Sequence, residues 1–194
     1  MKRLSLYLIL LLFTLQAPSL AEDIRDFQVE GISVGDSLLD YFSEEEIKKN
    51  KRKTPFKSKK YSRYLIQKTK NYDALRFYIK SNDKNYNIYS LTGIKNYVND
   101  YKGCLKEQKK IINDLDELFK NENNFKKTGP DKIISKQDKS KKSFFLSYRY
   151  IFNNGDLIDI VCYDWSENVI FADGLNVGIK LDEYYQWNLN EAWK

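Results

Sequence analysis

Apolar and polar residues alternate in several stretches of the chain, and this period of two predicts β-strands. Residues 73–79 and 86–94 alternate on either side of the polar turn 81–84, which predicts a hairpin. Residues 65–70 are a further strand candidate. A second and clearer hairpin is expected where residues 144–152 lead into the Asn-Gly turn that precedes residues 157–165, because Asn-Gly favours positive φ.

Two elements are expected after the second hairpin. Residues 175–181 alternate, and Asp173-Gly174 predicts a tight turn that joins them to a strand at residues 169–172. Residues 183–193 predict a short C-terminal helix with Tyr185, Leu189 and Trp193 on one side.

Helical spacing replaces the alternation between residues 97 and 120, where one apolar stripe includes Cys104. Closer to the N-terminus, Gly35-Asp36-Ser37 predicts a helix start with Asp36 or Ser37 as N-cap and with Leu38, Leu39 and Phe42 buried. The sequence Ser43-Glu44-Glu45-Glu46 is a capping box and predicts a helical turn through Asn50.

Two segments without a regular period are expected to be polar, basic loops. Residues 48–63 contain nine Lys or Arg and no acid, and residues 121–142 contain seven lysines and one possible short strand around Ile133. The remaining pattern predicts an α+β fold, in which one long helix packs on an antiparallel sheet behind a short N-terminal helix.

The first 21 residues have the pattern of a signal peptide. Lys2 and Arg3 precede an apolar run, Leu4 to Leu15, that is too short to span a membrane, and Ser19-Leu20-Ala21 fits a signal-peptidase site. Cleavage after Ala21 would leave residues 22–194 as a single α+β domain in the periplasm or outside the cell. The alternative is an uncleaved anchor or a buried helix.

Export would change the expected state of the two cysteines and the net charge of the mature chain. Cys104 and Cys162 are the only cysteines, so an oxidising compartment predicts a disulfide between the long helix and the sheet, with free thiols as the alternative. Loss of Lys2 and Arg3 lowers the net charge from +6 to +4, which is too small to predict a nucleic-acid partner.

The absence of histidine excludes several kinds of chemistry. A chain of 194 residues without histidine has no Ser-His-Asp or Cys-His catalytic unit and no histidine-ligated zinc or haem. We expect no cofactor and no metal. The string Gly35-Asp36-Ser37-Leu38 matches the opening block of GDSL lipases and esterases, but the histidine base of that family is missing, and a helix cap explains the string.

Three further patterns suggest a function. A carboxylate-dependent hydrolase would need paired acids, and the cluster around the second hairpin consists of Asp156, Asp159, Asp164 and Glu167. An edge or half-exposed strand at residues 144–152 would let Tyr148 and Tyr150 bind a peptide or a glycan, although core packing is the commoner role.

The third pattern is the basic segment, which would bind a polyanion or an anionic membrane surface. The alternative is an extended solvated loop, which the second lysine-rich segment favours. Its candidate anion-binding residues are Lys48, Lys49, Lys51, Arg52, Lys53, Lys57, Lys59, Lys60 and Arg63.

One block of the chain supports a resemblance. The run from Phe27 to Phe42, Phe-Gln-Val-Glu-Gly-Ile-Ser-Val-Gly-Asp-Ser-Leu-Leu-Asp-Tyr-Phe, resembles small exported proteins of unassigned function from low-GC marine alphaproteobacteria. The resemblance implies export and supplies no activity or site residues. Gly31–Gly35 is also similar to the helix start of small envelope domains related to the barrel-assembly lipoprotein, but this chain has no lipid-anchor cysteine there.

We therefore predict an exported, non-enzymatic domain that is associated with the envelope or binds a ligand. An envelope protein or an anionic surface is the expected partner. The alternatives are the carboxylate-dependent hydrolase and the polyanion or membrane-surface binder.

Overall fold

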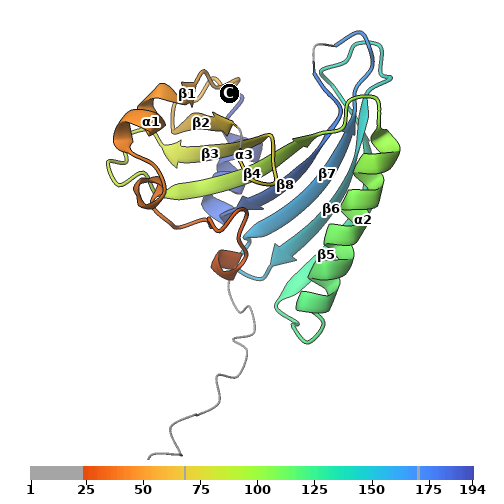
Figure 1. Cartoon of the computed structure of the whole chain (residues 1–194), viewed down its shortest axis with the longest axis horizontal. Coiled ribbons are helices and arrows are strands. Elements are labelled where there is room, and N and C mark those ends of the chain that lie inside the picture. Colours follow the sequence, from red (N-terminus) through yellow and green to blue (C-terminus); the bar gives the residue numbers. More distant parts are fainter. Residues whose placement is uncertain (1–23, 68, 170) are drawn as a thin grey trace, which may run out of the picture.

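The structure is a computed structural model that describes residues 24–67, 69–169 and 171–194. The signal-peptide prediction lies outside these residues. Eight antiparallel strands form one sheet in the order β1-β2-β3-β4-β8-β7-β6-β5 (Figure 1). Their bounds are Lys51–Arg52 (β1), Tyr61–Gln67 (β2), Ala74–Lys80 (β3), Ile88–Asn96 (β4), Phe125–Ile134 (β5), Phe144–Phe152 (β6), Leu157–Asp164 (β7) and Gly174–Lys180 (β8).

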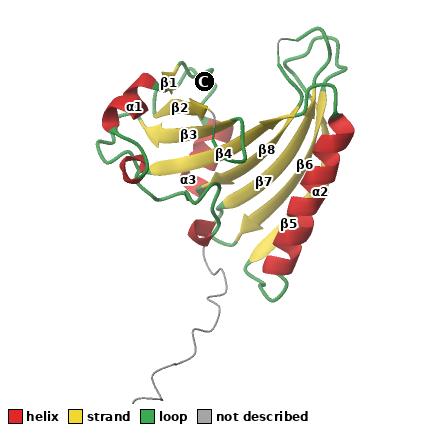
Figure 2. Ribbon diagram, viewed as in Figure 1, coloured by secondary structure: helices red, strands yellow, loops and turns green. Residues whose placement is uncertain are grey.

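Helical elements lie on both faces of this sheet, as Figure 2 shows by colour. The long helix α2 packs on one face, mainly against β7, and α3 packs on the opposite face near β4. The helical bounds are Ile24–Asp26 (η1), Leu38–Asp40 (η2), Glu44–Lys49 (α1), Tyr101–Leu118 (α2) and Asp182–Asn190 (α3). The predicted α+β class, with one long helix on an antiparallel sheet, is confirmed.

The core lies on the α2 face of the sheet. Strand residues one position apart point to opposite faces, so Leu75, Phe77 and Ile79 are buried there while Arg76 and Tyr78 point the other way. The segment 24–49 covers this face over β2–β4, and α2 covers it over β6–β8. The larger apolar core thus lies on this face, and the opposite face has a smaller aromatic cluster and most of the polar strand side chains.

The disulfide joins the two layers. Cys104 of α2 is bonded to Cys162 of β7, with 6.0 Å between the Cα atoms, and both residues are fully buried. Four residues further along α2, the side-chain amide of Gln108 donates to the carbonyls of Leu146 and Ile160, each at 2.9 Å. The predicted helix–sheet disulfide is confirmed.

A second, smaller cluster packs on the opposite face beneath α3. Trp187 of α3 is 1% exposed and contacts the rings of Phe56, Tyr61 and Tyr184. The predicted C-terminal helix is present, and it ends at Asn190, before Trp193. Tyr184 and Trp187 are buried, whereas Leu189 and Trp193 are exposed, because the large aromatic rings fill the gap above β2 and β3.

The predicted loop at 121–142 is also wrong, because β5 occupies ten of its residues. β5 pairs with β6 along its length, with a register shift between Thr128 and Asp131 at the cis peptide Gly129-Pro130. It is an edge strand with mostly exposed side chains, so lysines and a proline are tolerated and no apolar period appears.

The other basic segment is likewise not a plain loop. Residues 48–63 include the end of α1, the short strand β1 and the start of β2, which begins at Tyr61 rather than at residue 65. The expected strand at 169–172 is absent from the described residues of that stretch, and β8 pairs with β7 and β4 instead.

Both helix caps predicted in the N-terminal part are confirmed. Ser43 and Glu46 form the predicted capping box of α1, and Ser37 caps η2 by accepting from the amide of Leu39. Leu38 is buried as expected, but Leu39 is 42% exposed because η2 is a single 3₁₀ turn with room for one core contact.

The predicted hairpin pairings are confirmed as β3–β4 and β6–β7. The turn at 153–156 has positive φ only at Gly155 among its residues, and the amide of Gly155 donates to the carbonyl of Phe152. It is therefore a longer turn than the two-residue type that Asn-Gly favours.

Candidate functional site

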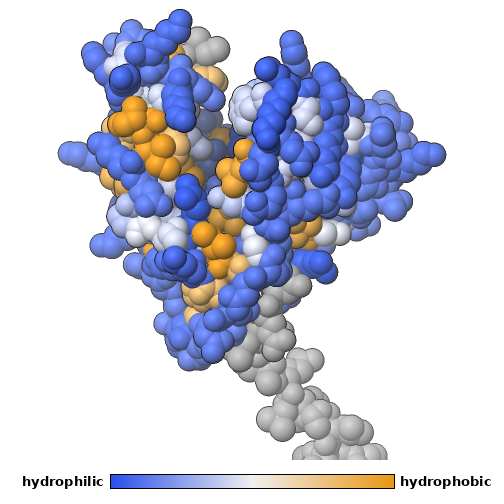
Figure 3. Space-filling model, turned by 180° about the vertical axis from the view of Figure 1, so that it is seen from behind, coloured by the Kyte–Doolittle hydropathy of each residue, from blue (hydrophilic) through white to orange (hydrophobic). Residues whose placement is uncertain are grey.

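A cleft lies on the face of the sheet opposite α2. It holds about 700 Å³ and is continuous through shared lining residues with a hollow of about 250 Å³ beside α3. Hollows at the β3–β4 turn and beside Tyr72 each hold about 420 Å³. Figure 3, which views this face, shows the surface hollowed between two lobes, with hydrophobic side chains near the hollow. We call this site the arginine cleft.

Two arginines from neighbouring strands form the cationic part of the arginine cleft. Arg63 of β2 pairs in register with Tyr78 of β3, and Arg76 of β3 pairs with Leu65 of β2. The two arginines are thus diagonal neighbours on one face, where Cβ atoms lie roughly 7–8 Å apart. Lys180 lines the adjoining hollow.

Neither guanidinium group forms a hydrogen bond or an ion pair with the described part of the chain, although Arg76 lies near the hydroxyls of Tyr163 and Tyr184. The Nε atoms of Arg63 and Arg76 are shielded from solvent without a hydrogen bond, and neither side chain is within ion-pair distance of a carboxylate. Lys180, by contrast, is paired with Asp159 at 2.5 Å. Two half-buried cations without counter-ions repel each other and lose hydration, so an anion bound between them would relieve both costs.

Aromatic rings form the walls. Tyr163 and Trp165 are stacked, with ring centroids 5.7 Å apart and an angle of 4° between the planes. The ring of Phe145 lies 5.4 Å from that of Tyr163, and the ring of Phe171 lies 4.8 Å from that of Trp165. Phe171 is 49% exposed. Trp193 lines the cleft from the C-terminal tail and is 52% exposed.

Amide side chains complete the lining, and none of its described residues is an Asp or Glu. The amides come from strands, loops and α3, as Asn96, Gln137, Asn176 and Asn188. Burial raises the pKa of the Tyr163 hydroxyl, and nearby Asp159 adds to this effect while Arg76 and Asn176 oppose it. Tyr163 is therefore a neutral hydroxyl at physiological pH.

The loop that carries Gln137 is fixed by one buried carboxylate. Asp138 accepts hydrogen bonds from the amides and hydroxyls of Ser140 and Ser143, and from the hydroxyl of Ser166 beside Trp165. The hydrogen bonds from Ser140 and Ser143 hold the pKa of Asp138 well below its usual range. The carboxylate thus ties the β5–β6 loop to the β7–β8 loop on one side of the cleft.

The C-terminal tail is fixed on the other side. The Ala192 carbonyl accepts from the amides of Lys57 and Ser58, and Trp187 Nε1 donates to the Ser58 hydroxyl at 3.1 Å. Both walls are therefore anchored by hydrogen bonds that do not involve a ligand.

The basic candidates of residues 48–63 are spread over several elements. Lys48 pairs with Glu44 at 2.8 Å, which raises the Lys48 pKa, and Lys60 pairs with Glu183 at 3.3 Å. Arg63 is the one of the nine that lines the arginine cleft. The others follow α1, β1 and the connection to β2, as Lys49, Lys51, Arg52, Lys53, Lys57 and Lys59.

Three of the remaining sequence candidates have structural partners, whereas burial and nearby Asp173 raise the pKa of Asp164, and Glu167 is exposed. The Ser37 hydroxyl donates to the carbonyl of Asn85 at 2.6 Å, which agrees with a cap and not with a nucleophile. Asp159 is engaged by Lys180, and Asp156 accepts from the amide of Asp182 at 2.8 Å. Tyr150 is fully buried, so the predicted platform role does not apply to it.

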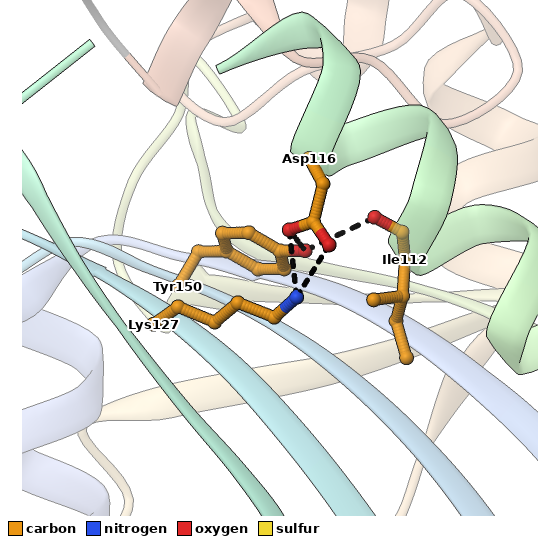
Figure 4. Close-up of polar contacts among 4 residues, drawn as sticks. All are labelled: Ile112, Asp116, Lys127 and Tyr150. Carbon is orange, nitrogen blue, oxygen red and sulfur yellow. Dashed lines mark hydrogen bonds and ion pairs between the residues drawn. The ribbon is translucent and has the colours of Figure 1, made fainter. Parts of the chain in front are cut away.

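Tyr150 belongs to a polar bracket between α2, β5 and β6 (Figure 4). Its hydroxyl lies 2.7 Å from Asp116 Oδ1 and 3.2 Å from the carbonyl of Ile112, and Lys127 Nζ lies 2.6 Å from Asp116 Oδ2. Burial alone would raise the pKa of Asp116, but Lys127 and Tyr150 lower it. Each group of the bracket is satisfied by another, so it holds α2 in place.

The chain matches no family model, no curated protein and no solved structure in three comparisons. Within the described ranges, no group of three or more acidic or cysteine side chains is arranged to hold a metal ion. No helix of the described residues is long and apolar enough to cross a membrane.

Sequence patterns point to only one of the two arginines. That one is Arg63, which belongs to the basic segment. Arg76 was missed, although its position between the buried Leu75 and Phe77, in a strand that is buried on most of both faces, was a usable signal. An arginine there needs an anion or a cleft. Its pairing with Arg63 depends on the β2–β3 register, which the sequence pattern did not place correctly.

Proposed function

We propose that this protein is an exported, non-enzymatic binding domain whose arginine cleft holds an anionic ligand. The observation that carries the proposal is the pair Arg63 and Arg76, whose guanidinium groups share one face and form no hydrogen bond or ion pair with the described residues. Guanidinium groups bind carboxylates and phosphates in bidentate geometry, and a partly buried site strengthens that bond.

Export is part of this proposal. The signal-peptide pattern, the resemblance to exported proteins and the disulfide are consistent with an oxidising compartment, the periplasm or the exterior. A binding role also fits the chemistry of the lining. With no histidine in the chain and no Asp or Glu among the described lining residues, the cleft offers no histidine or carboxylate as a general base, so the carboxylate-dependent hydrolase has no support there.

The basic segment is the competing site for an anion. Lys59 and Lys60 line the hollow at the β3–β4 turn, which also contains Asp83. Lys48 and Lys60 are already paired with glutamates. Arg52 is exposed on β1, where its guanidinium donates to the carbonyls of Lys49 and Lys51. A substitution of Arg52 therefore tests the segment without touching the arginine cleft.

The proposal is tested with anilinonaphthalene sulfonate, an anionic aromatic dye, on the oxidised mature protein. We expect the variants Arg63→Gln and Arg76→Gln to weaken dye binding at least about tenfold each, since a charge-assisted hydrogen bond contributes about 1.5–3 kcal/mol. We expect Arg52→Gln to leave binding unchanged. The free energy of unfolding should not fall in Arg63→Gln or Arg76→Gln, because no protein partner is lost.

Two results would contradict the proposal. One is equal dye binding by wild type and both cleft variants. The other is loss of binding only in Arg52→Gln, which would transfer the role to the basic segment. Sedimentation with anionic liposomes at two salt concentrations checks that second case, because surface electrostatic binding weakens as salt rises.

A further inference from the structure

We infer, resting on the proposed anion-binding function of the arginine cleft, that its ligand is an acidic saccharide, a short chain of uronate residues. The cleft combines an unpaired arginine pair, aromatic walls and a row of side-chain amides. Each of these three features matches a different part of a uronate sugar.

The arginine pair matches the carboxylate. A planar guanidinium donates two parallel hydrogen bonds to a planar carboxylate. The guanidinium groups of Arg63 and Arg76 lie on adjacent strands, so both can donate to one carboxylate from the same side. The described lining offers no Asp or Glu that would accept from neutral sugar hydroxyls and repel an acidic one. The charge of the cleft thus selects against neutral saccharides.

The aromatic walls match the faces of sugar rings. The C–H groups on one face of a pyranose ring pack against an aromatic plane, and the cleft presents such planes from two sides. Trp165 and Phe171 form one wall, and Trp193 from the C-terminal tail forms part of the other. Phe171 and Trp193 are each about half exposed, so their rings are accessible.

The amides match the hydroxyl groups. Asn and Gln side chains both donate and accept hydrogen bonds, as sugar hydroxyls do. Asn96, Asn176, Asn188 and Gln137 are distributed over the lining between the two walls. An alkyl chain in the same place would offer these amides no hydrogen-bonding group, which costs free energy where it excludes water, and an inorganic anion would leave the aromatic walls uncovered.

The volume fits a ligand larger than a single ion. A cleft of about 700 Å³ lies in the range of sites that bury small organic ligands, roughly 300–1,000 Å³. Its walls are fixed in advance by Asp138 on one side and by the contacts of Ala192 on the other. A prearranged cleft lowers the entropic cost of ordering the site on binding.

The test is calorimetric titration of the oxidised mature protein, with tryptophan fluorescence as a second readout. Two of the three tryptophans, Trp165 and Trp193, line the cleft. The probes are the trisaccharides of galacturonate and mannuronate, a hyaluronan tetrasaccharide, the methyl ester of the galacturonate trisaccharide, laurate and inorganic phosphate. We expect at least one uronate to bind and to change the fluorescence, and its methyl ester, laurate and phosphate to bind at least tenfold more weakly.

Variants assign that binding to the cleft. We expect Arg76→Gln to weaken uronate binding at least tenfold and Phe171→Ala to weaken it several-fold. The matched controls are Arg52→Gln, and Leu189→Ala for an apolar side chain of similar exposure on α3. Both controls should bind as wild type does.

The outcomes separate this inference from the proposed function. If laurate or phosphate binds as tightly as every uronate, in a manner that requires Arg76, the saccharide class is refuted and the anion-binding function stands. Binding of the methyl ester at equal affinity refutes the role of the carboxylate. If the dye shows Arg-dependent binding and no uronate binds, the saccharide class alone is refuted, and if no anion binds at all, both are refuted.

Discussion

On the face of the sheet opposite α2, charged residues differ in how their charges are neutralised. Asp159 and Lys180 form a half-buried ion pair, and Gly178, which lies opposite Asp159 on β8, leaves the space that the Asp159 carboxylate fills. A Cβ at Gly178 would lie 2.1 Å from Asp159 Oδ1. Arg63 and Arg76 receive no such compensation from the described residues. The same face thus contains a structural ion pair and a pair of cations available to a ligand.

Asp138 gives a prediction at this scale. Its folded-state pKa is depressed, so its contribution to stability is present above the ordinary aspartate pKa of about 3.9 and is lost as the pH falls toward the folded value. We expect Asp138→Asn to lower the free energy of unfolding at pH 7, because the amide group cannot accept from all of the serine donors. The difference from wild type should shrink at pH 3, as measured by urea denaturation.

The control for Asp138 is Asp114→Asn, an exposed carboxylate on α2. It should change the unfolding free energy little at either pH. An equal effect of Asp138→Asn at pH 7 and at pH 3 would contradict the electrostatic account of the loop anchor.

Among the elements, α2 shows how a helix is held on a sheet by more than its apolar stripe. Cys104, Gln108, Ile112 and Leu115 form its buried side, and Gln108 is the polar member. Its amide reaches the backbone of both β6 and β7. A buried amide is stable there because both of its donated hydrogen bonds are made.

We therefore expect Gln108→Leu to lower the free energy of unfolding by about 2 kcal/mol, since it removes two hydrogen bonds from buried carbonyls. Gln186→Leu on the exposed side of α3 is the matched control and should have a much smaller effect. Chemical denaturation of both variants measures the difference. A neutral Gln108→Leu would show that apolar packing alone determines the position of α2.

For the whole molecule, the disulfide is the covalent link between the helix layer and the sheet. The residues of the bond are 58 positions apart in the sequence, so reduction frees a long loop in the unfolded chain. We expect reduction to lower the free energy of unfolding by about 4 kcal/mol. The double variant Cys104→Ser/Cys162→Ser should match the reduced wild type, and denaturation of the oxidised protein with and without reductant provides the comparison. No difference between the oxidised and reduced proteins would refute this role.

The local elements of the fold could be predicted from the sequence, and the less regular ones could not. The β3–β4 and β6–β7 hairpins, α2 and the capping box of α1 follow from neighbouring residues, because alternation, helical period and capping act over a few positions. The β5 strand was predicted as a loop because an edge strand needs no apolar face. The buried side of α3 could not be predicted because it depends on rings from β2 and β3.

The sequence by itself determined the class of the fold, the pairing of the only two cysteines and the exclusion of histidine chemistry. These depend on composition and on local pattern. Only the tertiary structure decided that Arg63 and Arg76 lie together on an uncovered face between two anchored walls. The reason is physical: strand register and the placement of α2 and α3 determine which side of the sheet stays open, and both result from packing between residues far apart in the chain.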